Sequence, residues 1–458
     1  EFYIPDRMKE GYGPNIDALR NLKRTCDLLI TLDCGTTANG VIDQFSNEGG
    51  RVIIVDHHLQ GDKLPNALAI INPNTEKDNS HLKNLCAVGV VFLLVVSINR
   101  ELKKKNFYKN QSPNLIKFLD LVALGTICDL VKLDELNRTF VKQGLKVLKN
   151  SKNEGLVELI NQTNILKDLG EYHLGYVLGP RINAAGRVGN SYLGVKLLTE
   201  DNKKSRAVMA LKLEEFNTLR RKIENNVILD AYQKVDESDN GVICVSSANW
   251  HQGVIGIVAS KITEKFLRPS IVISEIDNVC KASCRSIGDF NIGKLIFDAI
   301  EKKILISGGG HKMAAGFSVY KSNIKAFQEF IIDKYDSRKN DIVKFFDCEI
   351  NSSSISKDLC NFQNKLAPYG QGNTKPRYLI RDCYIKYPKL VGNGHLSCFI
   401  EDKFGNKIKA IAFKAYDFDL ANQLENSGRD GIDLVISIKL NEWNGNDSVE
   451  IQIEDAIK

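Results

Sequence analysis

The stretch RVIIVDHH, residues 51–58, ends an apolar run abruptly with a carboxylate and two imidazoles. Residues 51–55 are typical of a buried strand. An earlier stretch, CDLLITLDCG (26–35), is also strand-like and ends in Asp33. Between the two, TTANGVIDQFSNEGG (36–50) has a helical pattern that two glycines close. The order strand, helix, strand predicts a βαβ unit with parallel strands.

Acidic residues and histidines should gather at one edge of this sheet. Parallel strands bring their carboxyl ends to the same edge, where open α/β sheets bind ligands. Asp33, Asp56, His57 and His58 should therefore face one crevice. Asp129 lies in another apolar segment, LIKFLDLVALGTICDLVKL (115–133), and taken alone would be a helix cap or a buried acceptor. Beside two acidic strand ends, we instead expect it in the same crevice.

These side chains suit a hard or borderline divalent cation. Carboxylates and imidazole without thiolates favour Mn²⁺ or Mg²⁺. Two such ions could clamp a phosphodiester and activate a water molecule. A single histidine is usually a packing or surface residue, but an adjacent pair after an aspartate is harder to explain that way. One histidine could bind metal while the next reaches a phosphate.

Composition sets few limits on function. The chain has 458 residues, enough for roughly two to four domains. The net charge of +6 allows a nucleic-acid partner without requiring one. The eleven cysteines form no CxxC pair and no zinc-type cluster, so we expect reduced, packing cysteines. With no signal peptide and no apolar run near the roughly 18 residues of a membrane span, we expect a cytoplasmic protein without membrane contact.

An ordered series of motifs gives a stronger indication. VDHH (55–58) is similar to the hallmark of the DHH phosphoesterase superfamily, and the chain as a whole resembles the RecJ family of single-strand-specific 5′ exonucleases. The matching blocks are YIPDRMKEGYG (3–13), ITLDCGTT (30–37), ALGTICDLV (123–131), LGPRINAAGRVG (178–189), NWHQGVIGIVASKI (249–262), ASCRSIGDFNI (282–292), GGGHKMAAGFSV (308–319), LAPYGQGNTKPRY (366–378) and NEWNG (441–445).

The resemblance implies an α/β architecture in four parts. A parallel-sheet DHH catalytic domain would occupy 1–195, a connecting helix 196–236 and an α/β DHH-associated domain 237–340. An all-β oligonucleotide-binding (OB) barrel would occupy 341–458. The sequence itself supports the connecting helix, because apolar residues recur at helical spacing within 201–235. They are Val208, Leu211, Leu213, Phe216, Leu219 and Ile223. The last part has the short alternating runs of a barrel.

The resemblance also implies roles for individual residues. Asp33 would bridge two metal ions, and His57 and Asp129 would ligate one of them. Asp56 would orient a histidine from the second shell. His58 would contact the scissile phosphate.

Further residues would bind phosphates. The residues implied are Arg7, Arg181, Ser283, Arg285, Gly309, Gly310 and His311. Glycines permit close approach of the backbone to an anion, and arginine recognises phosphate bidentately. The alternatives are ordinary ones: a flexible glycine turn, a loop cap at Arg181 and a solvated strand residue at Arg285.

The implied activity is stepwise, metal-dependent degradation of single-stranded DNA from its 5′ phosphate to 5′-mononucleotides, in recombination and repair. The cofactor would be Mn²⁺ or Mg²⁺, with two ions in the intact protein. The implied partners are single-stranded DNA, a helicase and a single-strand-binding protein, and we expect a monomer.

Two rival functions stay open, and one feature departs from the family. A small-substrate DHH phosphodiesterase would lack the barrel that we expect from about residue 345. A catalytically dead scaffold would be free to lose Asp33, His57, His58 and Asp129, which are all present. The family has an acidic block before the equivalent of YIPDR, and nothing here matches it. We therefore expect an amino-terminally truncated piece of a nuclease, itself weak or inactive.

Overall fold

The computed structural model describes residues 2–6, 10–11, 13–163, 165, 169–332, 334–337, 345–417, 419–427, 431–443 and 446–457. They divide into two compact units. The first comprises Glu1–Val227, His251–Val254 and Pro368–Asn373, and the second comprises Ile228–Trp250, Ile255–Ala367 and Thr374–Lys458. The boundaries of the four domains expected from the sequence stay predictions.

The amino-terminal sheet has the predicted βαβ order. Strands β1 (Leu29–Leu32), β2 (Val52–Val55) and β3 (Ala69–Ile71) are parallel and adjacent in that order. Helix α1 spans Ile16–Lys23, and α2, between β1 and β2, spans Asn39–Asn47. Since side chains alternate along a strand, β2 contributes to two cores. Val52 and Ile54 pack with Phe45 of α2, whereas Val55 packs with Leu85.

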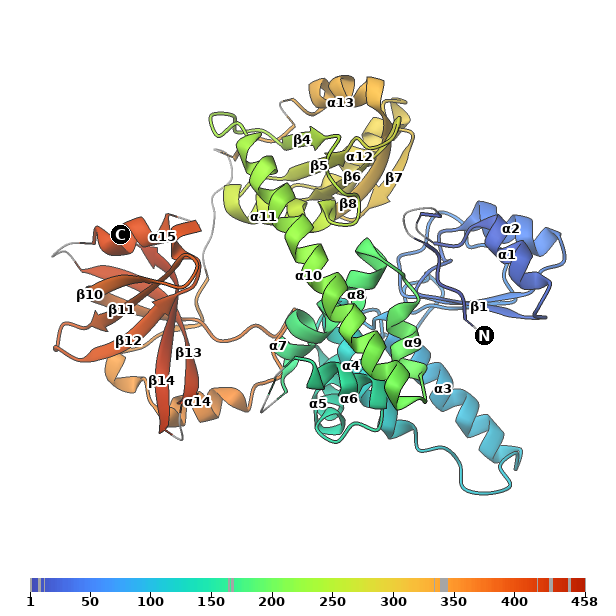
Figure 1. Ribbon diagram of the computed structural model, residues 1–458, viewed down its shortest axis with the longest axis horizontal. Helices are drawn as coiled ribbons and strands as arrows, with labels where there is room; N and C mark the ends of the chain where they lie inside the picture. The colour runs from blue at the N-terminus through green and yellow to red at the C-terminus, as the bar shows by residue number, and fades with distance from the viewer. Residues whose placement is uncertain are drawn as a thin grey trace. The chain divides into compact units, whose positions relative to one another are not determined.

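Helices complete the first unit (Figure 1). They are α3 (Ala87–Lys104), a 3₁₀ turn (Leu115–Phe118), α4 (Leu119–Cys128), α5 (Glu135–Leu148), α6 (Glu154–Asn161), α7 (Glu171–His173), a π turn (Leu174–Leu178), α8 (Gly179–Val188) and α9 (Leu193–Thr199). Helices α4 and α5 pack closely, because a Cβ on Gly144 would lie 2.1 Å from the carbonyl oxygen of Leu119. Asp129 follows directly after α4, at the carboxyl end of a helix.

The predicted connecting helix is confirmed as α10, Lys203–Gln233, a single helix of 31 residues (Figure 1). Its buried face was only partly predicted. Leu213 is buried, but Val208 and Leu211 are 64% and 52% exposed. Polar residues occupy part of the buried face instead, namely Arg206, Asn217 and Glu224.

The second unit contains a mixed five-stranded sheet in the order β4-β5-β6-β8-β7. The strands are β4 (Ile243–Ser247), β5 (Ser270–Ser274), β6 (Val279–Arg285), β7 (Ser307–Gly310) and β8 (Ala314–Tyr320). Strands β4 and β5 are parallel, and the other pairs are antiparallel. The accompanying helices are α11 (Ile255–Phe266), α12 (Ile292–Glu301), a 3₁₀ turn (Lys321–Asn323) and α13 (Ile324–Ile331).

The carboxy-terminal part is the predicted barrel. Its strands are β10 (Tyr378–Val391), β11 (His395–Glu401), β12 (Lys407–Ala412), β13 (Ile432–Trp443) and β14 (Asn446–Ile457). The order β11-β12-β14-β13-β10 is closed by pairing of β10 with β11, which leaves no free edge among these five. Accompanying elements are β9 (Cys348–Glu349), α14 (Lys357–Asn364), α15 (Leu420–Glu425) and 3₁₀ turns at Ser352–Ser354 and Ala415–Asp417.

Two general expectations can be compared with the structure. All eleven cysteines lie in described parts of the chain, and all are free thiols, as predicted. Among the helices that the structure describes, none has the length and apolar character needed to cross a membrane.

Candidate metal centre

Asp33 sits in a tight turn directly after β1. Its backbone N–H donates to the carbonyl of Val55 on the neighbouring strand, at 3.0 Å. Asp33 has φ 62°, which is unusual for a residue with a side chain. Gly35 follows with φ 117°, and a Cβ there would lie 2.8 Å from Oγ1 of Thr31. The turn therefore requires glycine, and its strained backbone directs the Asp33 side chain beyond the strand end.

Asp56, at the end of β2, is an internal hydrogen-bond acceptor. Its side chain is 1% exposed. It accepts from the backbone N–H of Thr36 at 3.0 Å, from that of His57 at 2.8 Å and from Nδ1 of His58 at 2.7 Å. Burial alone would raise the pKa of Asp56, but the hydrogen bonds from His58 and Thr36 hold it well below its usual range. Asp56 is thus an anion whose oxygens are already engaged within the turn.

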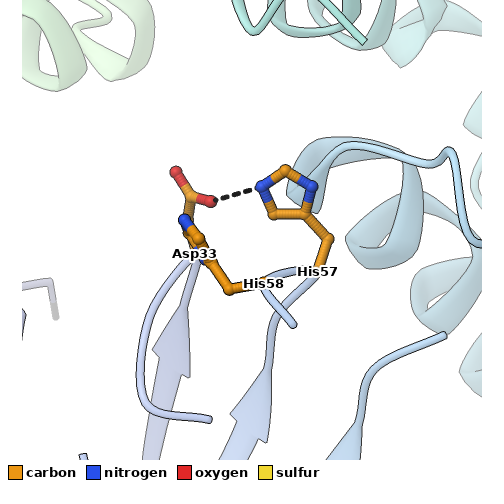
Figure 2. A group of neighbouring side chains, drawn as sticks. All are labelled: Asp33, His57 and His58. Carbon is orange, nitrogen blue, oxygen red and sulfur yellow. Dashed lines mark ion pairs between the residues drawn. The ribbon is translucent and has the colours of Figure 1, made fainter. Parts of the chain in front are cut away.

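His57 presents one ring nitrogen to two carboxylates, of which Figure 2 shows that of Asp33. Its Nδ1 lies 3.1 Å from the carbonyl oxygen of Leu85, which only a protonated nitrogen can satisfy. Nε2 lies 3.3 Å from Oδ1 of Asp33 and 3.5 Å from Oδ2 of Asp129. An imidazole fixed in this way can offer the Nε2 lone pair to a cation.

His58 points toward the same place (Figure 2). One potential ligand atom each from Asp33, His57 and His58 lies within 4.8 Å of the others. The hydrogen bond to Asp56 raises the pKa of His58. His58 is thereby held as a proton-bearing group beside the carboxylates.

The electrostatics of the cluster favour a cation. Burial lowers the pKa of His57, but the hydrogen bond to Asp33 and the charge of Asp129 outweigh it, so the net shift is upward. The pKa of Asp129 is raised by burial and by the nearby charge of Asp33. Burial is the larger cause of the Asp129 shift, but both shifts include the effect of a neighbouring carboxylate charge, which a divalent cation would offset.

The donor set fits Mn²⁺ or Mg²⁺ better than zinc. Cys34 and Cys128 are the neighbours in sequence of Asp33 and Asp129. Burial raises the pKa of each thiol to about 11, so neither offers a thiolate at neutral pH. Carboxylate oxygens and one imidazole nitrogen remain.

Sequence reasoning missed the residues that hold the Asp56–His58 turn. The Nδ2 group of Asn72 donates to Oγ1 of Thr36 at 2.9 Å and to the carbonyl of His58 at 2.8 Å. That of Asn74 donates to the carbonyl of His57 at 2.6 Å. A signal was present, because both asparagines follow β3, the next parallel strand.

Of the predicted phosphate-binding arginines, Arg181 lies in the first unit. Arg181 is buried on α8, forms an ion pair with Glu214 of α10 and donates to the carbonyl of Val177 at 2.8 Å. Its guanidinium is therefore partly engaged within the first unit. Arg7 lies outside the described residues.

The remaining predicted phosphate-binding residues lie on one sheet of the second unit. In register, Ser283 of β6 pairs with Gly316 of β8, which pairs with Gly309 of β7. Gly316, between Ser283 and Gly309, has no side chain to cover this part of the sheet. Two further residues follow on the same elements, with Arg285 ending β6 and His311 following β7.

Arg285 has a defined setting within this unit. Its Nε donates to Oγ of Ser260 at 3.1 Å, and Nη1 donates to the carbonyl of Cys284 at 2.8 Å. A Cβ on Gly256, in the first turn of α11, would lie 3.1 Å from Oγ of Ser283. Glycine thus leaves room where the helix start faces these two side chains.

Family comparisons agree with this architecture. The family described as "DHH family, N-terminal domain" matches residues 1–126, the DHHA1 domain matches 239–336, and the RecJ OB domain matches 346–455. The parallel sheet with its Asp56–His58 turn therefore defines a phosphoesterase of the DHH class.

Individual relatives narrow this class. The chain is 32% identical to the single-stranded-DNA-specific exonuclease RecJ of Salmonella typhimurium, over 99% of this chain and 81% of that protein. It is also 32% identical to RecJ of Escherichia coli, over 99% and 82%. The crystal structure of RecJ from Thermus thermophilus with Mn²⁺ superimposes with a TM-score of 0.83 at 26% identity, covering 97% of this chain and 64% of that one. The chain belongs to the RecJ family.

Proposed function

We propose that this protein is a metal-dependent exonuclease that degrades single-stranded DNA from the 5′ end to 5′-mononucleotides. The proposal depends mainly on one observation, that a carboxylate oxygen of Asp33 and one of Asp129 both lie close to Nε2 of His57. The relatives named as single-stranded-DNA-specific exonucleases support this substrate. The matched OB domain argues against a phosphodiesterase for small substrates.

The first part of the proposal concerns the metal ligands. Asp33, His57 and Asp129 would hold Mn²⁺ or Mg²⁺, with Asp33 placed to bridge to a second ion. The bound metal would supply an activated water and offset charge on the phosphate. Asp56 keeps the turn rigid by accepting from the backbone N–H of Thr36 and His57.

The second part concerns the nucleic acid. His58, whose protonated form is favoured by its bond to Asp56, would donate to the scissile phosphate. Ser283, Arg285, Gly309, Gly310 and His311 would hold phosphates along the strand, and Arg7 and Arg181 would contribute to the 5′-phosphate site. Arg181 would need to exchange part of its pairing with Glu214 for the phosphate. Because phosphate contacts carry no base information, sequence preference should be slight.

The barrel would bind the strand by stacking and charge. Tyr387 of β10 and Phe399 of β11 are 74% and 41% exposed, and their ring centroids are 6.5 Å apart. Lys386 pairs with Phe399 across the strands and adds positive charge. Exposed aromatics beside lysines are typical of surfaces that bind unpaired bases. Tyr378, by contrast, is buried and bonded to Gln363, so it belongs to the core.

The remaining parts of the proposal concern the cell. A strand-specific nuclease needs duplex to be opened, so we propose a helicase and a single-strand-binding protein as partners. We also propose a monomer that works in the cytoplasm, where its DNA substrate lies.

The test is digestion of a 3′-labelled oligonucleotide in Mn²⁺. A 5′-phosphorylated single strand should release mononucleotides stepwise. A blunt duplex should be resistant, and EDTA should stop the reaction. Asp129→Asn should abolish it while leaving binding of the strand intact, with exposed Asp17→Asn as the matched control. Cleavage of dinucleotides but never of the long strand would contradict the proposal.

A further inference from the structure

One buried asparagine connects a segment that contacts His57 with the segment that follows Asp129. Asn137, in the first turn of α5, is 1% exposed. Its Nδ2 group donates to the carbonyl of Asn84 at 2.6 Å and to the carbonyl of Lys132 at 2.8 Å. Of the two ends of this amide, only the NH₂ can donate to two carbonyls, which fixes the orientation of the side chain.

Each of these carbonyls belongs to a segment that contacts or follows a candidate metal ligand. Asn84 precedes Leu85, whose own carbonyl oxygen is 3.1 Å from Nδ1 of His57. Lys132 lies in the segment that follows Asp129, where Leu130 has a positive φ of 56°. Because a strained backbone persists only when its surroundings fix it, this segment needs external support. Asn137 provides that support from one side.

A turn from far along the sequence supports the same segment from the other side. The turn, Pro368–Asn373, belongs to the first unit. The backbone N–H of Leu133 donates to the carbonyl of Gln371 at 2.7 Å. Leu133 is buried against Gly370, since a Cβ on that glycine would lie 2.8 Å from Cδ1 of Leu133.

The turn is itself well defined. Gly370 and Asn373 exchange backbone hydrogen bonds at 3.0 and 3.1 Å, and Nδ2 of Asn373 donates to the carbonyl of Pro368 at 2.7 Å. The backbone N–H of Tyr369 donates to Glu171 of α7 at 3.1 Å. This turn is closed by its own hydrogen bonds and is hydrogen-bonded to α7. It can therefore limit movement of the segment after Asp129.

We propose that Asn137 and the turn Pro368–Asn373 are positioning elements that set the distance between His57 and Asp129 for cation binding. The inference rests on the proposed metal site. Asn137 sets the spacing of the two segments, because one planar amide holds both carbonyls. The turn prevents the Asp129 segment from moving away when it carries no cation.

The test is Mn²⁺ binding by the whole chain, measured by calorimetry. Asn137→Leu keeps the side-chain size and removes both donors. Loss of an outer-shell partner typically weakens metal affinity about 10- to 100-fold, and we expect a change in this range. Affinity for single-stranded DNA in EDTA should stay unchanged, and any catalysis should recover at saturating Mn²⁺. A general loss of structure would change all three.

The matched control is Asn153→Leu. Asn153 also bonds through its side chain on both sides, accepting from Leu156 N at 2.8 Å and donating to the carbonyl of Leu198 at 3.0 Å. It lies in the same unit but contacts no segment of the metal centre. This variant should lower the melting temperature while Mn²⁺ affinity stays at the wild-type value.

A second variant keeps the inference testable if Asn137→Leu does not fold. Gly370→Val forces a side chain against Leu133 and should also weaken Mn²⁺ binding, whereas Gln371→Ala should not, because Gln371 acts through its backbone carbonyl. Wild-type Mn²⁺ affinity in folded Asn137→Leu and Gly370→Val would overturn the inference alone. Absence of Mn²⁺ binding by the wild-type chain would overturn the proposed metal site, and the inference with it.

Discussion

The carboxylate of Asp33 lies 3.3 Å from Nε2 of His57, although the two residues follow different strands. The register of the sheet accounts for this. Leu32 pairs with Val55, so the residues that come after each strand emerge side by side. A helix end then delivers Asp129 to the same nitrogen at 3.5 Å. Three segments that are distant in sequence therefore concentrate negative charge around one imidazole.

Removal of a ligand should abolish metal binding without unfolding the protein. We expect Asp33→Ala, His57→Ala and Asp129→Ala each to weaken Mn²⁺ binding by more than about 100-fold, the upper range for loss of an outer-shell partner. In EDTA, the melting temperature should not fall in Asp33→Ala or Asp129→Ala, because each change relieves the repulsion between these two carboxylates. Calorimetry and thermal melts measure both effects. Retention of Mn²⁺ affinity in any of the three would exclude that residue as a ligand.

Metal affinity should depend on pH in a defined direction. The groups that face His57 are Asp33, Asp129 and His58, and the two carboxylates raise its pKa despite burial. A raised pKa means that the proton stays on the ring to higher pH, where it competes with the cation. Mn²⁺ affinity should therefore be highest above the raised pKa and fall as pH drops from about 8 to about 6.

The measurement is calorimetry in buffers of different ionisation enthalpy, which reports the protons released on binding. We expect proton release that grows as pH is lowered. His251 is a useful reference histidine, because burial lowers its pKa. Replacing His251 should leave the pH profile unchanged. Affinity that is constant between about pH 8 and pH 6 would show that His57 is not a ligand.

Much of this centre follows from local sequence patterns. The βαβ unit was predictable because the strands are short apolar runs and the helix between them ends at two glycines. The type of element before Asp129 was not, because the segment Leu119–Cys128 is apolar on all sides and gives no periodicity. The same uniform burial explains why it packs as a central helix. Asp129, the residue after this helix, was assigned to the crevice because two acidic strand ends accompany it in the sequence, not because of any periodicity.

Contacts between residues far apart in the sequence could not be predicted from sequence patterns either. Arg181 pairs with Glu214, and Gln371 bonds to Leu133, yet no spacing rule links either pair. The buried face of α10 was only partly predicted for a similar reason, because Val208 and Leu211 follow the apolar period and yet are exposed. Contacts of this kind depend on tertiary packing, which local periodicity does not encode.

Asp56 should control both stability and the charge of His58. Asp56→Asn replaces a buried anion that accepts from Thr36, His57 and His58. We expect a loss of about 1–3 kcal/mol in the free energy of unfolding. The pKa of His58 should fall, because its hydrogen bond to a carboxylate is the main cause of the upward shift.

Thermal melts in EDTA and NMR titration of the His58 ring measure these effects. Asp78→Asn is the control, since Asp78 is a half-buried turn acceptor for Ser80 outside the metal centre. It should change stability less and leave the His58 titration unaltered. An unchanged His58 pKa in Asp56→Asn would show that the charge of His58 is set elsewhere.

Arg285 should contribute to recognition of phosphate. Its Nε is held by Ser260 and its Nη1 by the carbonyl of Cys284. Arg285→Ala should weaken binding of single-stranded DNA roughly uniformly across sequences and reduce the salt slope by about 1. Fluorescence anisotropy at several salt concentrations measures both. Arg381→Ala is the control, because Arg381 pairs with Glu349 and Asp433 on the barrel. Equal losses in both variants would mean that Arg285 has no special role.

The central claim is that Asp33, His57 and Asp129 share one cation. A crystal structure with Mn²⁺, with anomalous data collected at the manganese edge, tests it most directly. The account predicts an anomalous peak with Nε2 of His57 and oxygens of Asp33 and Asp129 all at roughly 2–2.5 Å. A manganese ion bound elsewhere, or one that touches His57 while either carboxylate points away, would contradict it.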